Sequence, residues 1–346
     1  MATTRARDAG DYVVAPTIDE LVGNAGQNGQ ILRKVSAGVY EWGYLGGNEP
    51  NYGASGTQVM VAGGSTATQN AIDDVEMKQY ASDATGVSHG LLAGDRKYSQ
   101  GATNGQVAMF GGGYDTAQMS SVEFKQFASN ATGTLQGSLT IARNSLYGAS
   151  DGDQAMFCCG FSGSYYNISE LKSFADAANS LSHGTIGSVE VRAPAAATDS
   201  NSVMLNGGLG SAGYSNQNVL KLWSSSAAAI TFGSAGIGRN SHSAASDGTS
   251  AVFVSGWDGA AGGRTPVIEK CLFTDSSSMT SYGNLSTQRN WMGSASNGTS
   301  YVTCCGWTST NRTTTCEISQ FSSSSTSVSH GTVITARHAV DSITGN

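Results

Sequence analysis

Aromatic and arginine side chains recur in this sequence shortly after a repeated glycine, where their chemistry suits binding rather than catalysis. They are Tyr114, Tyr165, Tyr166, Tyr214, Trp257, Arg264, Trp307 and Arg312. Aromatic rings among hydroxyl, amide and carboxylate groups favour contacts with sugars or proteins. We therefore treat these eight as candidate ligand-binding residues. Phe161, Trp257 and Trp307 directly follow their glycine, so packing between structural units is an equal alternative for them.

The sequence offers no grouping of nucleophile, acid and base. Serine and threonine are abundant, but no Gly-x-Ser-x-Gly motif sits at a strand-to-helix turn. The five histidines stand alone or recur at equivalent places in different repeats, which separates them instead of gathering them around a metal ion. We therefore expect a protein that is not an enzyme and that has no catalytic residue, metal site or cofactor.

Acidic residues and arginines recur at regular intervals along the chain. The acidic positions are Glu76, Glu123, Glu170, Glu269 and Glu317, with Val219 in the fourth copy. The arginines are Arg96, Arg143, Arg192, Arg239, Arg289 and Arg337. Because both signs repeat, we expect these arginines to bond to the glutamates or to carbonyls of a neighbouring unit. A ring of arginines that lines a channel mouth and holds an anion is the alternative.

These residues belong to a unit that recurs six times. Its clearest copy, residues 246–257, is a turn, an alternating apolar stretch and a closing glycine. The closing glycines are Gly64, Gly112, Gly160, Gly208, Gly256 and Gly306, which are 48 residues apart four times and then 50. A period near 48 residues, four short strand candidates per unit and no helical periodicity predict an all-β fold, a propeller with six four-stranded blades.

The third copy illustrates the expected blade, with strands over residues 143–149, 154–158, 168–174 and 185–189. Asp151-Gly152 favours positive φ and predicts a type I′ hairpin between the first two strands. The repeat resembles the kelch motif, in which paired glycines close the second strand and an arginine lies near the unit boundary. Gly63-Gly64 keeps the pair, whereas Cys159-Gly160 keeps only its second glycine, and the tyrosine and tryptophan of that family are mostly missing. The resemblance implies a divergent, kelch-like propeller.

The units occupy residues 47–346 and leave residues 1–46 as a separate domain. The first unit lacks an opening arginine, while residues 337–344 form an opening stretch that no further unit follows. We expect this stretch to complete the blade of residues 57–94 and to close the ring, since closure removes free sheet edges. In a seven-bladed alternative, residues 39–45 would help to build an extra blade.

The first 46 residues carry a different pattern, in which two short strands are predicted around residues 36–38. The segments Gly26-Gln27-Asn28-Gly29-Gln30-Ile31-Leu32 and Tyr40-Glu41-Trp42 resemble a segment of tail-fibre and other structural proteins of tailed bacteriophages. The resemblance implies an arm, with Ile31, Leu32, Tyr40 and Trp42, that attaches to other virion proteins or joins subunits. It also implies a homotrimer, the state common in fibres. A linker folded back on the propeller is the alternative.

Composition argues against several other classes of protein. Only 12% of residues are charged, the net charge is -7 and no basic run stands out, so we expect no nucleic-acid partner. No apolar run suits a membrane span and no signal peptide is visible, so we expect a soluble product of the host cytoplasm. The six cysteines lie in predicted strands, where we expect buried thiols.

The combined expectation is a structural protein of a tailed-phage virion, as a tail fibre, a spike or a capsid decoration. Its propeller would bind a glycan or protein on the host surface. The alternative is a kelch-like carbohydrate-active enzyme or a free lectin, which needs convergent acids or a metal ion on one face of the ring.

Overall fold

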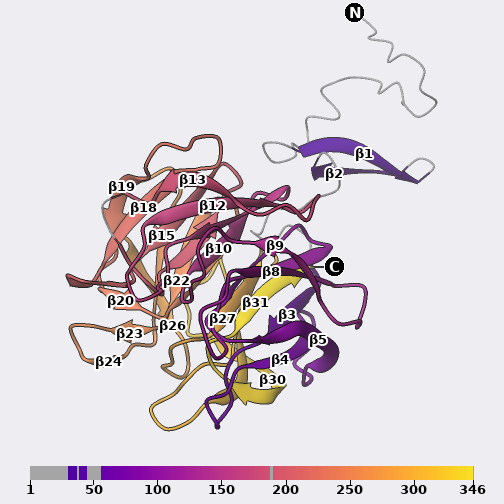
Figure 1. The fold of residues 1–346 in the computed structure, drawn as a ribbon. Coiled ribbons are helices and arrows are strands. Elements are labelled where there is room, and N and C mark those ends of the chain that lie inside the picture. Colours follow the sequence, from indigo (N-terminus) through magenta and orange to yellow (C-terminus); the bar gives the residue numbers. More distant parts are fainter. Residues whose placement is uncertain (1–29, 37–38, 45–55, 188–189, 346) are drawn as a thin grey trace, which may run out of the picture. The chain divides into compact units, whose positions relative to one another are not determined.

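The computed structural model describes the backbone of residues 30–36 and 39–44 and all atoms of residues 56–187 and 190–345. The elements in these ranges are strands and isolated bridges, and none is a helix (Figure 1). The all-β prediction is therefore confirmed. The chain divides into two compact units, residues 1–49 and residues 50–346.

The described part of the first unit is a hairpin of β1 (Gln30–Ser36) and β2 (Val39–Tyr44). The two strands are antiparallel, with Leu32 opposite Trp42, which confirms the two predicted strands. Ile31 and Tyr40 also lie on this hairpin, and among the described strands β2 pairs with β1 alone. The remaining residues of the predicted arm lie outside the described residues.

The second unit contains six antiparallel sheets of four strands each. The first strands are β6 (Gln100–Thr103), β10 (Tyr147–Ser150), β14 (Ala195–Thr198), β21 (Ser243–Ser246), β27 (Gly293–Ser296) and β31 (Asp341–Gly345). The second strands, in the same order, are β7 (Val107–Gly111), β11 (Gln154–Cys158), β15 (Ser202–Asn206), β22 (Ser250–Val254), β28 (Ser300–Cys304) and β3 (Gln58–Ala62). The third strands are β8 (Ser121–Gln126), β12 (Ile168–Ser173), β18 (Gln217–Leu222), β25 (Val267–Leu272), β29 (Thr313–Gln320) and β4 (Ile72–Gln79). The fourth strands are β9 (Thr134–Ser138), β13 (Leu181–Thr185), β19 (Ile230–Ser234), β26 (Thr280–Asn284), β30 (Val328–Arg337) and β5 (Val87–Arg96).

The third copy tests the predicted strand positions. Its second and third strands match the prediction, but the first begins at Tyr147 rather than at residue 143, and the fourth is Leu181–Thr185 rather than 185–189. The fourth strand is largely accessible, with Leu181 72% exposed. A strand with so little buried surface needs no alternation of apolar and polar residues, which is the pattern on which the prediction relied.

The hairpin between the first two strands of this copy is confirmed, but its turn is not type I′. Gly152 has a φ of 100°, whereas Asp151 is not among the residues with positive φ. Instead, the Asp151 carboxylate accepts hydrogen bonds from the backbone N–H groups of Asp153 and Gln154, at 3.0 and 2.8 Å. The side chain thus stabilises a longer turn, as aspartate commonly does.

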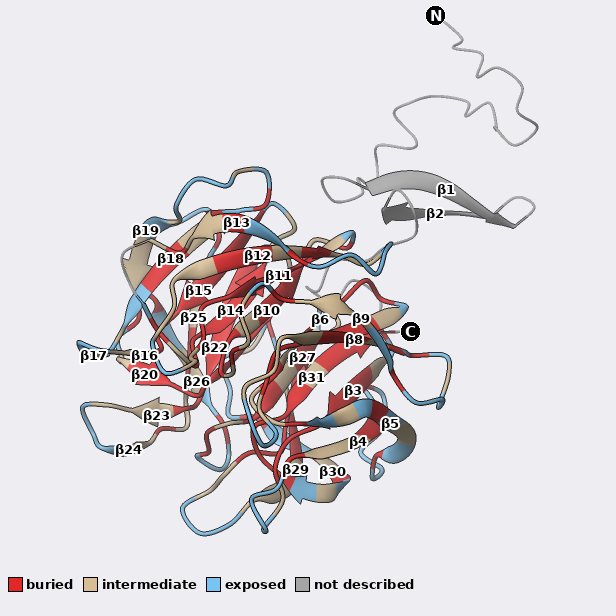
Figure 2. Cartoon of the chain, in the orientation of Figure 1, coloured by how far each residue is buried: buried red, intermediate tan, exposed pale blue. Residues whose placement is uncertain are grey.

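The core lies between sheets rather than within one sheet. Second strands are apolar on both faces, as in the fully buried run Ala251-Val252-Phe253-Val254, and burial falls towards the fourth strands (Figure 2). Six hydrophobic clusters each combine residues of two consecutive sheets. The sixth joins Val59 of β3 to Val302 of β28, so every sheet packs against two neighbours.

The last described strand, β31, belongs to the same sheet as β3, β4 and β5, which come first along this unit. Antiparallel pairing joins β31 to β3, with Ile343 opposite Met60. The sheet is therefore built from both ends of residues 50–346, and its order is β31-β3-β4-β5. Because β31 shields one side of β3, its hydrogen-bonding groups are not left at an open edge.

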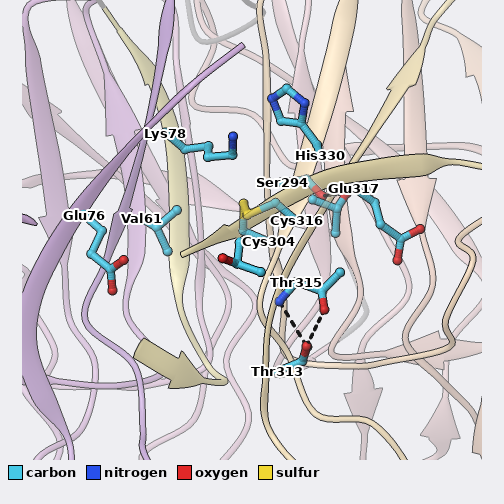
Figure 3. The surroundings of a disulfide bond; sticks show 12 residues. Val61, Glu76, Lys78, Ser294, Cys304, Thr313, Thr315, Cys316, Glu317 and His330 are labelled. Atoms are coloured by element: carbon cyan, nitrogen blue, oxygen red, sulfur yellow. Dashed lines mark hydrogen bonds between the residues drawn. A yellow bond between two sulfur atoms is a disulfide. The ribbon is translucent and has the colours of Figure 1, made fainter. Parts of the chain in front are cut away.

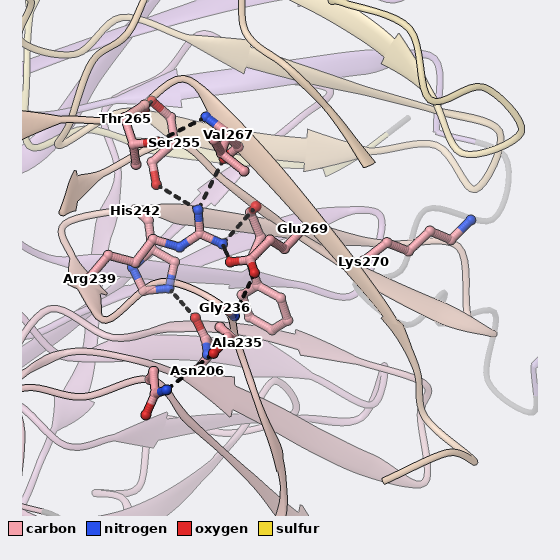
Figure 4. Close-up of polar contacts among 12 residues, drawn as sticks. Asn206, Ala235, Gly236, Arg239, His242, Ser255, Thr265, Val267, Glu269 and Lys270 are labelled. Atoms are coloured by element: carbon pink, nitrogen blue, oxygen red, sulfur yellow. Dashed lines mark hydrogen bonds and ion pairs between the residues drawn. The ribbon is translucent and has the colours of Figure 1, made fainter. Parts of the chain in front are cut away.

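Five junctions between sheets contain a buried arginine–glutamate pair. Figure 4 shows one, in which Arg239 Nη2 donates to Glu269 at 2.7 Å, while Nη1 and Nη2 also donate to backbone carbonyls. The Glu269 carboxylate also accepts from Gly236 N, in the link from the preceding sheet. The other pairs are Arg96–Glu123, Arg143–Glu170, Arg289–Glu317 and Arg337–Glu76. All five arginines are fully buried, so the predicted pairing is confirmed and the alternative of a channel-lining ring is wrong for them.

Arg192 is the exception, and its assignment as the sixth equivalent arginine is wrong. Gly160 N donates to the carbonyl of Val191 at 3.0 Å, as Gly113 N donates to that of Arg143 at 2.9 Å. Val191 therefore occupies the arginine position, and Arg192 is half-buried one residue later. The same bond shows that Gly113, not Gly112, is the closing glycine of the second unit.

The cysteines also depart in part from the prediction. Cys304 of β28 and Cys316 of β29 form a disulfide across paired positions of the two strands (Figure 3). Such pairing brings two Cα atoms close enough for a bridge, here 4.2 Å apart. The expectation of a thiol is therefore wrong for these two residues. Cys158, Cys159, Cys271 and Cys305 are free thiols, as predicted, although Cys271 is only half-buried.

Candidate functional site

A cycle of backbone hydrogen bonds connects the six segments that lead into the first strands. Ser145 N donates to Tyr98 O at 2.8 Å, and each later member donates to the one before it until Tyr98 N donates to Ala339 O at 3.3 Å. The six members are Tyr98, Ser145, Ala193, Ser241, Trp291 and Ala339. All six have positive φ. We call them the link residues.

The six loops between second and third strands lie on the same side as this cycle. Each loop pairs with the residue just before a link residue: Tyr114 with Lys97, Phe161 with Asn144, and Trp307 with Asn290. The remaining loops pair in the same way, through Ser65–His338, Leu209–Arg192 and Trp257–Asn240. In two loops the chain adds small hairpins, β16 (Leu209–Gly210) with β17 (Gly213–Tyr214), and β23 (Trp257–Asp258) with β24 (Gly263–Arg264), where β23 also pairs with β20 (Arg239–Asn240). We call this side, residues 63–71, 112–120, 159–167, 207–216, 255–266 and 305–312, the loop face.

Four aromatic groups on the loop face are covered by a cation. The Arg312 guanidinium lies 4.3 Å from the Trp307 ring centroid, and that of Arg264 lies 5.4 Å from Trp257. In the other two stacks, Lys97 lies over Tyr114, and Arg192 lies over both Phe161 and Tyr165. Each such stack contributes about 0.5–1 kcal/mol when exposed and more when desolvated. The stacks hold the aromatic side chains of neighbouring segments in defined positions.

The structure therefore brings the predicted binding residues to one face, although none is fully exposed. Tyr165, Trp257 and Trp307 are half-buried. Each of these rings contacts a neighbouring segment and is also partly accessible to solvent. The two alternatives, packing between units and exposure for binding, therefore both apply to them. Tyr166 is half-buried as well, and its backbone bridges to Val191. Tyr214 is 40% exposed and lies against the Cα side of Gly259 in the next loop.

Tyr98 and Trp291 were not predicted, yet they are the bulky members of the cycle. Their ring centroids are 4.7 Å apart in an edge-to-face arrangement, and both rings line a pocket bounded by all six link residues. Positive φ disfavours a bulky side chain, and the other four links carry only serine or alanine. The fold therefore does not require aromatic residues here. A comparison of the six copies at this position would have identified the pair.

His338 connects this aromatic pair to the Trp307 stack. Its ring centroid lies 4.9 Å from that of Trp307 and 6.3 Å from that of Tyr98. Arg312 Nε donates a hydrogen bond to His338 Nδ1 at 3.1 Å. Nδ1 accepts in that bond, because an arginine N–H can only donate, and the same atom lies 3.2 Å from the carbonyl oxygen of Ser65. Burial and the positive charge of Arg312 lower the pKa of His338 to about 4, so the imidazole is neutral near pH 7.

Below the link residues, a polar cavity runs between the first strands of the six sheets. It contains the buried Asp341, whose Oδ2 accepts a hydrogen bond from Ser99 Oγ at 2.7 Å. Its Oδ1 has no partner among the described residues. Burial raises the pKa of Asp341 to about 7, although the nearby Arg96 lowers it. Among the residues that line the cavity, Asp341 has the one carboxyl group and His242 the one imidazole.

Within the described ranges, no three His, Cys, Asp or Glu side chains are grouped as metal ligands. No helix long and apolar enough to cross a bilayer occurs there either. Comparison with protein-family models and with curated proteins finds no match for this chain. The arrangement itself, aromatic rings and cations gathered on one face, is therefore the functional evidence.

Proposed function

We propose that residues 47–346 form a six-bladed, kelch-like β-propeller. Three observations support this proposal: six four-stranded sheets, a hydrophobic cluster at each of six junctions, and a hydrogen-bonded cycle of six link residues. The pairing of β31 with β3 acts as the closure of the ring. The kelch-like label depends on the glycine and arginine pattern of the repeats.

We further propose that the protein is a non-enzymatic structural component of a tailed-phage virion. Residues 1–46 act as the arm that binds other virion proteins or sister subunits, with a homotrimer as the assembly. This part of the proposal depends on the resemblance of the segment from Gly26 to Trp42. The protein is then located in the virion, as a fibre, a spike or a decoration of the capsid.

The loop face binds a glycan or a protein on the surface of the host. The observation that carries this function is the convergence of four cation–aromatic stacks and the Tyr98–Trp291 pair on one side of the sheets. Loops on a rigid scaffold are the usual place for binding, and aromatic rings dominate the energetics of such surfaces.

Adsorption to bacteria tests the proposal. Fluorescently labelled full-length protein is added to a panel of environmental bacteria, beside a Trp257→Ala/Trp307→Ala variant and a Leu181→Ala control. Leu181 is exposed but lies on the outer strand β13. We expect the wild type and the control to mark particular cells and the tryptophan variant to lose most of this binding.

The same preparations separate the alternatives. Light scattering with size exclusion should show that only the full-length chain, not residues 47–346, forms oligomers. Absence of binding to every strain would refute host recognition and leave an architectural role. Release of sugar from bacterial polysaccharides would instead support a carbohydrate-active enzyme.

A further inference from the structure

The best-defined group of side chains on this side of the sheets adjoins the pocket lined by the link residues, through Tyr98 and Trp291. It consists of Tyr98, Trp291, Trp307, Arg312 and His338, and we call it the axial mouth. Contacts connect its members in sequence: Tyr98 to Trp291, Tyr98 to His338, His338 to Trp307, and Trp307 to Arg312. Residues from two separate repeats and from the last link thus form one continuous surface.

Arg312 has unused hydrogen-bonding capacity in this group. Its Nε donates to His338, and its guanidinium plane covers Trp307. Its Nη2 is shielded from solvent and has no partner among the described residues. A buried donor without an acceptor costs about 1–3 kcal/mol, and more when the group is charged. An acceptor supplied by a ligand would remove that cost.

The electrostatic surroundings of the axial mouth are positive, although the protein as a whole has a net charge of -7. Burial raises the pKa of Tyr98, while Arg312 and Arg192 lower it. Burial lowers the pKa of Lys97, an effect that Asp115 opposes and Arg312 reinforces. Three cations therefore act on this small region, and Asp115 is the acidic group that acts on Lys97. His338 adds no charge near pH 7, since its pKa is lowered to about 4.

The rings of Tyr98 and Trp291 supply the apolar part of a binding site. Both are half-buried, and no cation of the described residues covers either ring, whereas Trp307 and Trp257 are each covered by an arginine. Uncovered aromatic rings can contact the apolar C–H face of a sugar ring, while neighbouring donors bind its substituents. Carboxylates match the fork of an arginine guanidinium especially well.

We infer that the axial mouth binds an acidic saccharide, with the sugar ring against Tyr98 and Trp291 and the sugar carboxylate on Arg312. This inference rests on the proposed function, because it names the class of host-surface ligand that the loop face recognises. The neutral His338 holds Arg312 in place through Nε, and the ligand carboxylate binds the accessible part of this half-buried side chain.

Paired saccharides test the inference with the full-length chain. The probes are oligosaccharides that carry galacturonate, glucuronate or sialate, each beside its neutral methyl ester, and binding is measured by calorimetry and by saturation-transfer NMR. We expect at least one acid to bind at least tenfold more tightly than its ester, with an affinity that falls as salt rises. The NMR contacts should come from the C–H face of the sugar.

Variants then assign the contacts. Arg312→Gln should lose the tenfold preference for the acid, and Trp291→Ser should weaken binding of acid and ester alike. Lys270→Gln is the matched control, since Lys270 covers Tyr282 at 4.4 Å on the outer strands, away from the loop face. Melting curves check that each variant is folded, and Arg312→Lys, which keeps the charge but not the fork, should recover only part of the preference.

The outcomes separate this inference from the proposed function. If no acid binds better than its ester, or if Arg312→Gln keeps the preference, an acidic saccharide is not the ligand. The protein would still be a host-binding protein if it adsorbs to cells and the tryptophan variant does not. If wild-type protein marks no cell, the proposed host recognition fails, whereas binding of an acid in vitro would still support the site.

Discussion

Val191 and Val219 occupy, at one junction between sheets, the two positions that hold a buried arginine and a buried glutamate at the other five. Both valines belong to one hydrophobic cluster. Removal of one charge would leave its partner buried and unpaired, whereas replacement of both by apolar side chains removes the desolvation cost of both. At this junction valine therefore replaces both the arginine and the glutamate, and no single charge is left unpaired. This junction shows that the fold accepts an apolar contact in place of the ion pair at one of its six positions.

A double-mutant cycle at Arg239 and Glu269 measures this relationship. Arg239→Val should lower the free energy of unfolding by about 3–5 kcal/mol, because Glu269 is left buried without its cation. The double variant Arg239→Val/Glu269→Val should lie within about 2 kcal/mol of the wild type, since only backbone groups then lack partners. Urea unfolding followed by tryptophan fluorescence gives both values.

The Glu269→Val variant completes the cycle and serves as its control. It should be about as unstable as Arg239→Val, because the guanidinium is then unpaired. A double variant that is less stable than either single variant would show that the pair has a role that valines cannot replace.

The fold was predictable because the same pattern of turns and strands recurs in six repeats. Each copy repeats the turn and the buried second strand, and five of the six repeat the glutamate, so errors in one copy are corrected by the others. The exposed outer strands were placed poorly, as with Leu181–Thr185, because one-sided burial at an edge leaves a weak apolar pattern. Arg192 was misassigned because a one-residue shift in spacing placed it beside the true position, Val191.

The candidate site was predictable only where aromatic residues follow the repeated glycines. Trp257 and Trp307 could be identified in this way, and the structure brings both to the loop face. Tyr98 and Trp291 could be identified only by a comparison of the six copies at the link position, and their place in the cycle of hydrogen bonds depends on positive φ, which no single sequence position reveals. The Cys304–Cys316 bridge depends in the same way on strand register.

Reduction of the Cys304–Cys316 disulfide should destabilise the protein. The bridge closes a loop of 12 residues, which corresponds to about 2–3 kcal/mol of stabilisation. Dithiothreitol should therefore lower the melting temperature of the wild type but not that of a Cys304→Ala/Cys316→Ala variant. Mass spectrometry of the alkylated protein gives the number of free thiols, and six in the untreated protein would mean that the bridge does not form.

Removal of residues 337–346 should give an aggregating or unfolded product, because β3 would lose the partner that β31 provides. The matched control is a permuted chain in which the same ten residues are moved ahead of residue 50. It should remain soluble and should melt near the temperature of the wild type. Light scattering and thermal melts compare the two chains. A truncated protein that stays monomeric with an unchanged melting temperature would contradict this role of β31.

The buried carboxyl of Asp341 predicts how stability changes with pH. Its folded-state pKa of about 7 lies above the ordinary value near 3.9. Between these values the folded protein binds more protons than the unfolded chain, so this group stabilises the fold fully below pH 4 and loses that contribution as pH rises through 7. Asp341→Asn keeps an acceptor for Ser99 but cannot ionise. Its stability should match that of the wild type at pH 4 and exceed it by up to about 4 kcal/mol above pH 8.

Urea unfolding at several pH values between 4 and 9 measures the difference between Asp341→Asn and the wild type. Asp275→Asn is the control, because Asp275 lies in an exposed turn where it accepts a hydrogen bond from Ser277 N. The control measures the effect of an Asp→Asn substitution in an exposed turn. If the difference for Asp341→Asn does not change with pH, the carboxylate is ionised in the folded protein at low pH, and water or an ion in the central cavity must satisfy its Oδ1. A difference that grows across pH 5 to 8 identifies Asp341 as the group whose ionisation limits stability in alkaline solution.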